Sequence, residues 1–135
     1  MMDADTIAQL VRDGYDARQR GDKEAMAGFF APGATYRMVG HAALGDRLPV
    51  EPVDAMEAIG ALIDQFTFND IQIVQMLADS NTAMLQLRLE VATDGDPLHT
   101  EACDIWEFDD DGKVTAITQF VDTVLVVQAM EALVA

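Results

Sequence analysis

The sequence is poor in cysteine and in basic residues, and it has no long apolar run. Cys103 is its only cysteine, which excludes an intrachain disulfide and a cysteine-rich metal site. Eight Lys and Arg stand against 24 Asp and Glu, a net charge of −16, which opposes binding to nucleic-acid phosphates and to anionic membranes. No apolar run approaches the ~18 residues that span a bilayer, and no basic segment precedes an apolar core near the start. We therefore expect a cytoplasmic protein without nucleic-acid or membrane partners.

Histidine is also scarce, and common cofactor motifs are missing. His41 and His99 lie far apart, without the spacing that is typical of metal ligands on one element. The sequence has neither the glycine-rich loops of nucleotide-binding proteins nor the Gly-x-Ser-x-Gly turn of serine hydrolases. It therefore predicts no metal and no cofactor.

What is present is typical of one globular domain, residues 1–135, because half of the residues are apolar and this length can bury a sizeable core. Apolar residues at helical spacing predict a first helix, with Asp5 or Thr6 as its N-cap and Gly21 at its end. Asp22 and Asp54 are expected to begin a second and a third helix.

Alternating apolar and polar residues predict the strands that follow these helices. The expected strands are residues 34–39, 67–77, 82–93, 97–108 and 113–123. The order of elements is typical of an α+β fold, in which a curved antiparallel sheet wraps around about three N-terminal helices and leaves an internal pocket in a cone-like molecule. The apolar tail after residue 123 is either a strand end or a short helix.

The segment LHTEACDIWEF, residues 98–108, places one acid on the wrong side of a strand. Asp104 shares its face with Leu98, Ala102 and Trp106, whereas the alternate residues suit solvent. A two-residue turn at Asp94–Gly95 would set the hairpin register and place a leucine opposite Asp104. Asp104 is therefore expected to face the interior.

The order of elements, with GYDARQRGDKEAMAGFFAPGATY near the start and ACDIWEFDDDGKV near the end, resembles the nuclear transport factor 2-like superfamily, in the branch of ketosteroid isomerases and SnoaL-like polyketide cyclases. The resemblance covers roughly residues 5–123 and implies a cystatin-like fold and a homodimer. In ketosteroid isomerases a Tyr and a protonated Asp form an oxyanion hole, and by position these roles fall on Tyr15 and Asp104. The general base of those isomerases, another Asp, falls at Met38, which cannot accept a proton.

The first functional hypothesis is a protein that binds a small, mainly apolar molecule with a carbonyl or phenolic oxygen. Asp104 and Tyr15 would hydrogen-bond that oxygen and, if the protein is catalytic, support the enolate chemistry of an isomerase or cyclase. His41, or a loop carboxylate such as Asp46 or Glu51, would serve as the base. The other residues expected to line the pocket are Tyr36, Met38, Leu87, Leu89, Trp106, Phe108 and Gln119.

The alternative is a non-catalytic dimerisation or partner-binding module whose pocket is filled by its own side chains. Met38 favours this alternative, because it stands where the isomerases carry their base. The inward-facing Asp104 favours the first hypothesis, because burying an acid without a use for it costs several kcal/mol.

Overall fold

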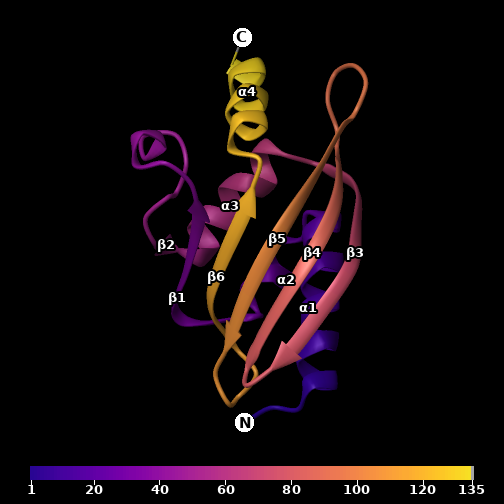
Figure 1. Cartoon of the computed structure of the whole chain (residues 1–135), viewed down its shortest axis with the longest axis vertical. Helices are drawn as coiled ribbons and strands as arrows, with labels where there is room; N and C mark the ends of the chain where they lie inside the picture. Colours follow the sequence, from indigo (N-terminus) through magenta and orange to yellow (C-terminus); the bar gives the residue numbers. More distant parts are fainter. Residues whose placement is uncertain (135) are drawn as a thin grey trace.

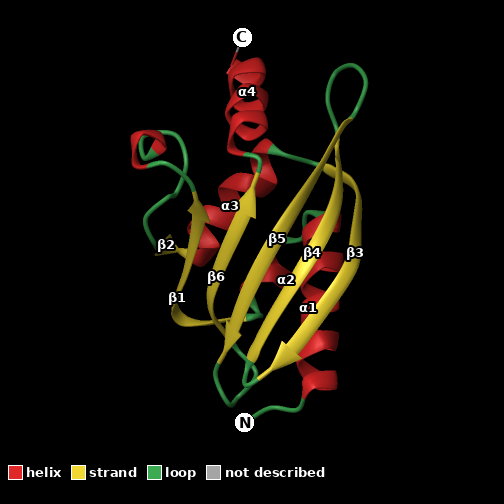
Figure 2. Ribbon diagram, viewed as in Figure 1, coloured by secondary structure: helices red, strands yellow, loops and turns green. Residues whose placement is uncertain are grey.

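The computed structural model describes residues 1–134 as a curved sheet with helices on one of its faces (Figure 1). The helices are α1 (Ala4–Arg20), α2 (Lys23–Ala27), α3 (Ala55–Gln65) and α4 (Thr123–Val134), with a short 3-10 helix, η1 (Ala42–Leu44). The strands are β1 (Phe30–Val39), β2 (Val53–Asp54), β3 (Phe68–Asp79), β4 (Thr82–Val91), β5 (Leu98–Phe108) and β6 (Val114–Val121). Figure 2 shows α1, α2 and α3 behind the strands, so the expected α+β class is confirmed.

Short polar residues and one glycine set the helix boundaries. The N-cap of α1 is Asp3, whose side chain accepts from the backbone N–H groups of Asp5 and Thr6, so the prediction of Asp5 or Thr6 as the cap was wrong by two or three residues. Gly21 ends α1 with a left-handed φ of 67°, as expected. The side chains of Asp22 and Asp54 cap α2 and α3, which confirms both predicted starts.

The sheet has six strands in the order β2-β1-β6-β5-β4-β3 and is not closed. Strands β3 to β6 form the expected antiparallel meander, but β1 pairs with β6 in parallel. The prediction of a purely antiparallel sheet was therefore wrong. β1 lies beside β6 in the sheet, and the alternation of side chains along a strand does not indicate which strand will pair with it.

The hairpin register is confirmed, although its turn differs from the prediction. Leu85 lies opposite Asp104 as expected, and Asp104 in turn lies opposite Gln119 on β6. Gly95 does not have the positive φ that the predicted two-residue turn needs, and residues 92–97 all lie outside the strands. The tight turn of this kind is at Ser80 and Asn81, with φ values of 52° and 59°, between β3 and β4.

The apolar tail is helical and packs against the end of the sheet. The Asp122 carboxylate accepts from the backbone N–H of Leu125 at 3.1 Å and thereby caps α4. Leu125 and Val126 then reach the interior, so α4 adds a wall that the sequence did not predict. Across residues 1–134, no helix combines the length and the apolarity that crossing a membrane requires.

Candidate functional site

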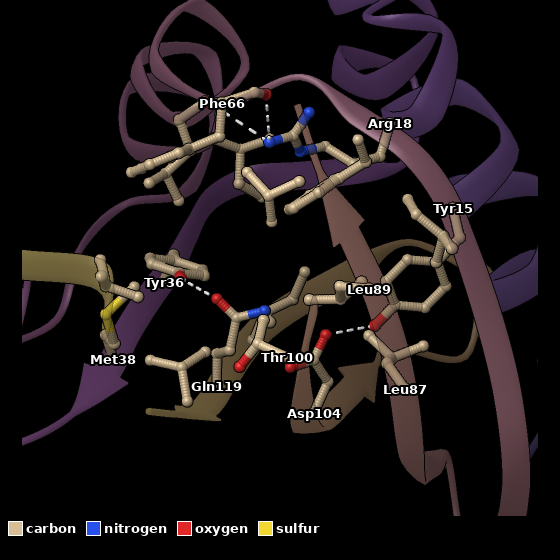
Figure 3. A pocket seen from close by; sticks show the side chains of 18 of the residues that line it. Tyr15, Arg18, Tyr36, Met38, Phe66, Leu87, Leu89, Thr100, Asp104 and Gln119 are labelled. Carbon is tan, nitrogen blue, oxygen red and sulfur yellow. Dashed lines mark hydrogen bonds between the residues drawn. The ribbon is translucent and has the colours of Figure 1, made fainter. Parts of the chain in front are cut away.

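A cavity of about 110 Å³ lies between the sheet and its helices (Figure 3). Most of its wall is apolar and comes from α1, α3, α4 and the inward face of the strands. The side chains that bring a polar atom to this wall are Tyr15, Arg18, Tyr36, Thr100, Asp104, Trp106 and Gln119.

Asp104 faces this cavity because β5 alternates its side chains between the two sides of the sheet. Its neighbours on the same side are Ala102 and Trp106, both buried, and Asp104 itself is 2% exposed. Asp104 is the only carboxylate among the described residues that line the cavity. The alternation of residues 98–108 therefore predicted the inward orientation of Asp104 correctly.

Tyr15 and Trp106 hold one oxygen of the Asp104 carboxyl group. The Tyr15 hydroxyl donates to Asp104 Oδ2, and Trp106 Nε1 donates to the Tyr15 hydroxyl oxygen at 2.9 Å. The two aromatic rings lie 5.2 Å apart and are tilted by 53°. Because the Tyr15 proton is directed at Asp104, this hydroxyl orients the carboxyl group rather than pointing at the empty part of the cavity.

The second oxygen of Asp104, Oδ1, is buried and has no hydrogen-bond partner within residues 1–134. Burial raises the pKa of Asp104 from 3.8 to about 6, although the Tyr15 and Gln119 side chains favour the charged form and oppose this shift. Near neutral pH the carboxyl group can therefore either donate a proton from Oδ1 or accept one there.

Gln119 presents its amide nitrogen to the same space. The Tyr36 hydroxyl donates to Gln119 Oε1, which leaves the amide N–H₂ group available, and Figure 3 shows the nitrogen on the side of Asp104. Burial and the nearby charge of Asp104 raise the pKa of Tyr36, so its hydroxyl stays neutral and remains a donor. Burial, followed by the charge of Asp104, also raises the pKa of Tyr15.

Arg18 is the functional candidate that sequence reasoning missed. It lies one turn after Tyr15 on α1, and its Nη2 donates to the carbonyl oxygens of Leu62 at 3.2 Å and Phe66 at 3.1 Å. Its guanidinium carbon lies 4.3 Å from the centre of the Phe68 ring. Its helical spacing with Tyr15 was a signal in the sequence, because it places a charge on the apolar side of the helix. Asp104 was identified in the same way, as a charged residue on the apolar face of a strand.

The remaining predicted residues divide into those inside and those outside the cavity. Tyr36, Met38, Leu87, Leu89, Trp106 and Gln119 line it. Phe108 does not line it; the ring is buried in the core and stacks on Trp106 at 6.1 Å. The alternation placed Phe108 on the inner face correctly, but Phe108 is the last residue of β5 and lies beyond the end of the cavity.

The predicted bases lie outside the cavity wall. His41 is exposed at the start of η1, where its Nδ1 accepts from the backbone N–H of Ala43 at 3.0 Å. Asp46 and Glu51 are exposed in the same loop. The prediction that His41, Asp46 or Glu51 serves as a base facing the ligand was therefore wrong. The chain turns away from the interior after β1 ends at Val39. Among residues 1–134, no group of His, Cys, Asp or Glu side chains is arranged to hold a metal ion.

The family model of the SnoaL-like domain matches residues 11–117, which is most of the chain. The chain belongs to the SnoaL-like domain family. This places it in the nuclear transport factor 2-like superfamily, as the resemblance implied. The search of curated proteins returned no match for this SnoaL-like protein.

Solved structures share the fold at low sequence identity. PrhC from Penicillium brasilianum NBRC 6234 is 17% identical with a TM-score of 0.79, over 97% of this chain and 89% of that one. A protein described as a SnoaL-like polyketide cyclase, from Jannaschia sp. CCS1, is 16% identical with a TM-score of 0.75, over 96% and 94%. An LEH-like epoxide hydrolase of M. tuberculosis is 14% identical with a TM-score of 0.72, over 96% and 92%. At these identities the comparison concerns the fold alone.

Proposed function

We propose that this SnoaL-like protein binds a small, mainly apolar molecule in the cavity and hydrogen-bonds its carbonyl or phenolic oxygen through Asp104. The observation that carries the proposal is the buried Oδ1 atom of Asp104, which has no partner among the described residues. A buried polar atom without a partner costs roughly 1–3 kcal/mol, and a ligand oxygen would recover that free energy. The apolar wall suits a ring or a hydrocarbon skeleton.

In this proposal Tyr15 is a positioning residue. Its hydroxyl donates to Oδ2 and accepts from Trp106, which fixes the carboxyl plane and keeps Oδ1 toward the ligand. Neutral Asp104 donates to a carbonyl or phenolate oxygen, whereas ionised Asp104 accepts from a phenol. The Gln119 amide, held by Tyr36, supplies a second donor.

The same geometry supports a proton shift beside a ketone. With the ketone oxygen on the Gln119 amide, ionised Asp104 takes a proton from the neighbouring carbon; the C–H electron pair forms the enolate, and the proton resides on Oδ1. Asp104 then returns this proton to the same carbon or to a conjugated one, so the protein ends unchanged and no oxidant is needed. A base with a pKa of about 6 is suited to this exchange near neutral pH.

Deuterium exchange next to a ketone tests the proposal. Wild-type protein in D₂O is expected to speed the exchange of the α-hydrogens of at least one ketone in a panel of 1-indanone, 1-tetralone and 2-cyclohexenone, followed by proton NMR. Asp104→Asn should lower this rate at least tenfold at ketone concentrations that calorimetry shows to saturate each protein. The wild-type rate should rise as pH passes about 6, where Asp104 ionises.

Asp46→Asn is the matched control, because Asp46 is an exposed acid outside the cavity. This variant should exchange the ketone at the wild-type rate. Equal rates in wild type and Asp104→Asn would overturn the catalytic part of the proposal. Absence of binding for all ketones and phenols would overturn the binding part as well.

The second candidate function is binding without catalysis. Met38 favours it, because this buried side chain takes the first-strand position at which the related isomerases carry their base. Binding of the panel without any exchange would select this function. A titration of phenols that gives binding only with Asp104 intact would still support the ligand site.

A further inference from the structure

We propose that Arg18 binds an anionic group of the ligand, so that the molecule accepted by the cavity carries a carboxylate or a similar acid at a distance from the oxygen held by Asp104. This inference rests on the proposed function and deepens it, because it names the chemical class of the ligand. It assigns to Arg18 a role in specificity, with no contact to the reacting atoms.

The first step of the argument is the position of Arg18 in the cavity wall. Figure 3 shows it on the far side of the hollow from Asp104 and Gln119. It projects from α1 on the same side as Tyr15, and its guanidinium group lies against the Phe68 ring. A ligand whose oxygen binds Asp104 can therefore contact Arg18 with a different part of the molecule.

The second step is the hydrogen-bond inventory of the guanidinium group. Nη2 is used by the carbonyl oxygens of Leu62 and Phe66 at the end of α3. Within residues 1–134, Nε and Nη1 have no acceptor, although both carry N–H groups. These free N–H groups are available to a ligand.

The third step is charge. Arg20, Arg47 and Arg88 each lie within ion-pair distance of a carboxylate, whereas Arg18 has no such partner in the part of the chain that the structure describes. Arg12 and Arg37 also lack an ion pair there, but they do not line the cavity. Burial lowers the pKa of Arg18 to about 10, which still leaves it charged at neutral pH. The negative end of α3 offers only partial compensation for this cation.

The fourth step is the match to an acid. A guanidinium group binds the two oxygens of a carboxylate through parallel hydrogen bonds, and such charge-assisted bonds are stronger than neutral ones. The protein as a whole carries a net charge of −16 and repels anions. Affinity for an acidic ligand must therefore come from a cation inside the cavity, and Arg18 is the Lys or Arg residue that lines it.

Matched ligand pairs test the inference by calorimetry. Each pair consists of a phenol and the same phenol with a distant carboxylate: phenol and 4-hydroxybenzoate, 2-naphthol and 6-hydroxy-2-naphthoate, and 4-phenylphenol and 4′-hydroxybiphenyl-4-carboxylate. The pairs differ in length, so one is expected to span from Asp104 to Arg18. For that pair, the acid should bind wild-type protein at least tenfold more tightly than its parent phenol.

Arg18→Gln should abolish this preference, while the affinity for the parent phenol stays within about threefold. Gln retains N–H groups that can meet the α3 carbonyls but carries no charge. The control is Arg12→Gln, which removes the same charge from an exposed position on the same helix and should leave the preference unchanged. Arg18→Lys, which keeps the charge without the planar fork, should retain part of the preference.

The outcomes separate this inference from the proposed function. If the phenols bind but no acid is preferred, or if the preference survives in Arg18→Gln, Arg18 has only a structural role at the end of α3 and the inference fails while the proposed function stands. If wild-type protein binds neither phenols nor their acids, both fail. The wild-type comparison is decisive by itself, even if Arg18→Gln does not fold.

Discussion

Asp104 is the residue at which stability and function oppose each other. It is 2% exposed, and its Oδ2 accepts from Tyr15 on α1, whose hydroxyl oxygen accepts from Trp106. The Gln119 side chain on β6 lies opposite and favours the charged form of Asp104. Arg18 is the cation of the same cavity and does not pair with it. Among the described residues, no positive charge therefore stabilises ionised Asp104 within the cavity, and its stabilisation comes from hydrogen-bond donors.

The burial of Asp104 predicts that the free energy of unfolding depends on pH. The pKa of Asp104 is raised from 3.8 to about 6 in the fold, so the fold is not penalised below pH 3.8, and the penalty grows until pH passes 6. The full penalty is about 3 kcal/mol, from 1.36 kcal/mol per pKa unit. Asp104→Asn should therefore be more stable than wild type at pH 8, by up to about 3 kcal/mol, and its advantage should fall to about half at pH 5.

Urea unfolding at pH 5, 6 and 8 measures this difference, and these conditions stay above the isoelectric point of about 4.1. The exposed control Asp46→Asn should follow the wild-type pH profile in parallel. A difference between Asp104→Asn and wild type that is constant with pH would show that Asp104 does not titrate in this way.

At the residue scale, strand positions were predictable and helix positions were less so. Side chains alternate regularly on β4 and β5, which pair without a bulge, so Asp104, Leu87 and Leu89 could be placed from the sequence. The helical spacing of Arg18 with Tyr15 places it only on the apolar side of α1, because the angle at which a helix lies on a sheet decides which of its side chains reach a cavity. Gln119 was expected, but its orientation depends on Tyr36 from a neighbouring strand.

At the element scale, α1 approaches β5 very closely at Gly14. A Cβ atom on Gly14 would lie 2.6 Å from the Trp106 ring, so only the absence of a side chain permits this contact. The close approach matters for the site, because it brings Tyr15, the next residue, onto Asp104 and Trp106.

Gly14→Ala should therefore destabilise the protein by about 1–3 kcal/mol, although alanine favours a helix by about 1 kcal/mol over glycine. Gly60→Ala is the matched control, since a Cβ there meets nothing within 4 Å in the middle of α3. This control should be neutral or stabilising by up to about 1 kcal/mol. Thermal unfolding compares the two, and equal effects would contradict the close packing of α1 on Trp106.

Elements that are set by local chemistry were predicted well, and those set by distant neighbours were not. Caps at Asp22 and Asp54 follow from short-range hydrogen bonds. The register of β4 and β5 followed from their inward faces, even though the turn that joins them has another geometry. The parallel pairing of β1 with β6 and the packing of α4 over the cavity depend on contacts that no local pattern contains.

At the scale of the whole molecule, one face of the sheet is left without helices (Figure 2). Val74, Met84 and Phe120 on this face are 41%, 49% and 43% exposed. We propose that this face forms a homodimer, as the superfamily resemblance implies. Two copies with a charge of −16 repel each other, so association should tighten as salt rises from 50 to 300 mM.

Sedimentation equilibrium tests the proposed dimer. Met84→Glu should weaken association at least tenfold, because it places a charge in the centre of the proposed interface. Val124→Glu makes the same chemical change on α4, away from the sheet, and should associate like wild type; Val124 is 65% exposed. A monomer at all concentrations, or equal effects of the two variants, would contradict this interface.

The strand order also constrains how the chain can acquire its shape. Because β1 joins the sheet through β6, a segment from the first third of the chain gains its long neighbour only when one of the last segments is in place. Contacts between such distant segments form late and slow the folding reaction. Tyr36 and Met38 gain their neighbours Ile117 and Gln119 only when β6 pairs with β1, and a nascent chain that ends before residue 114 lacks the part of the cavity wall that β6 and α4 form.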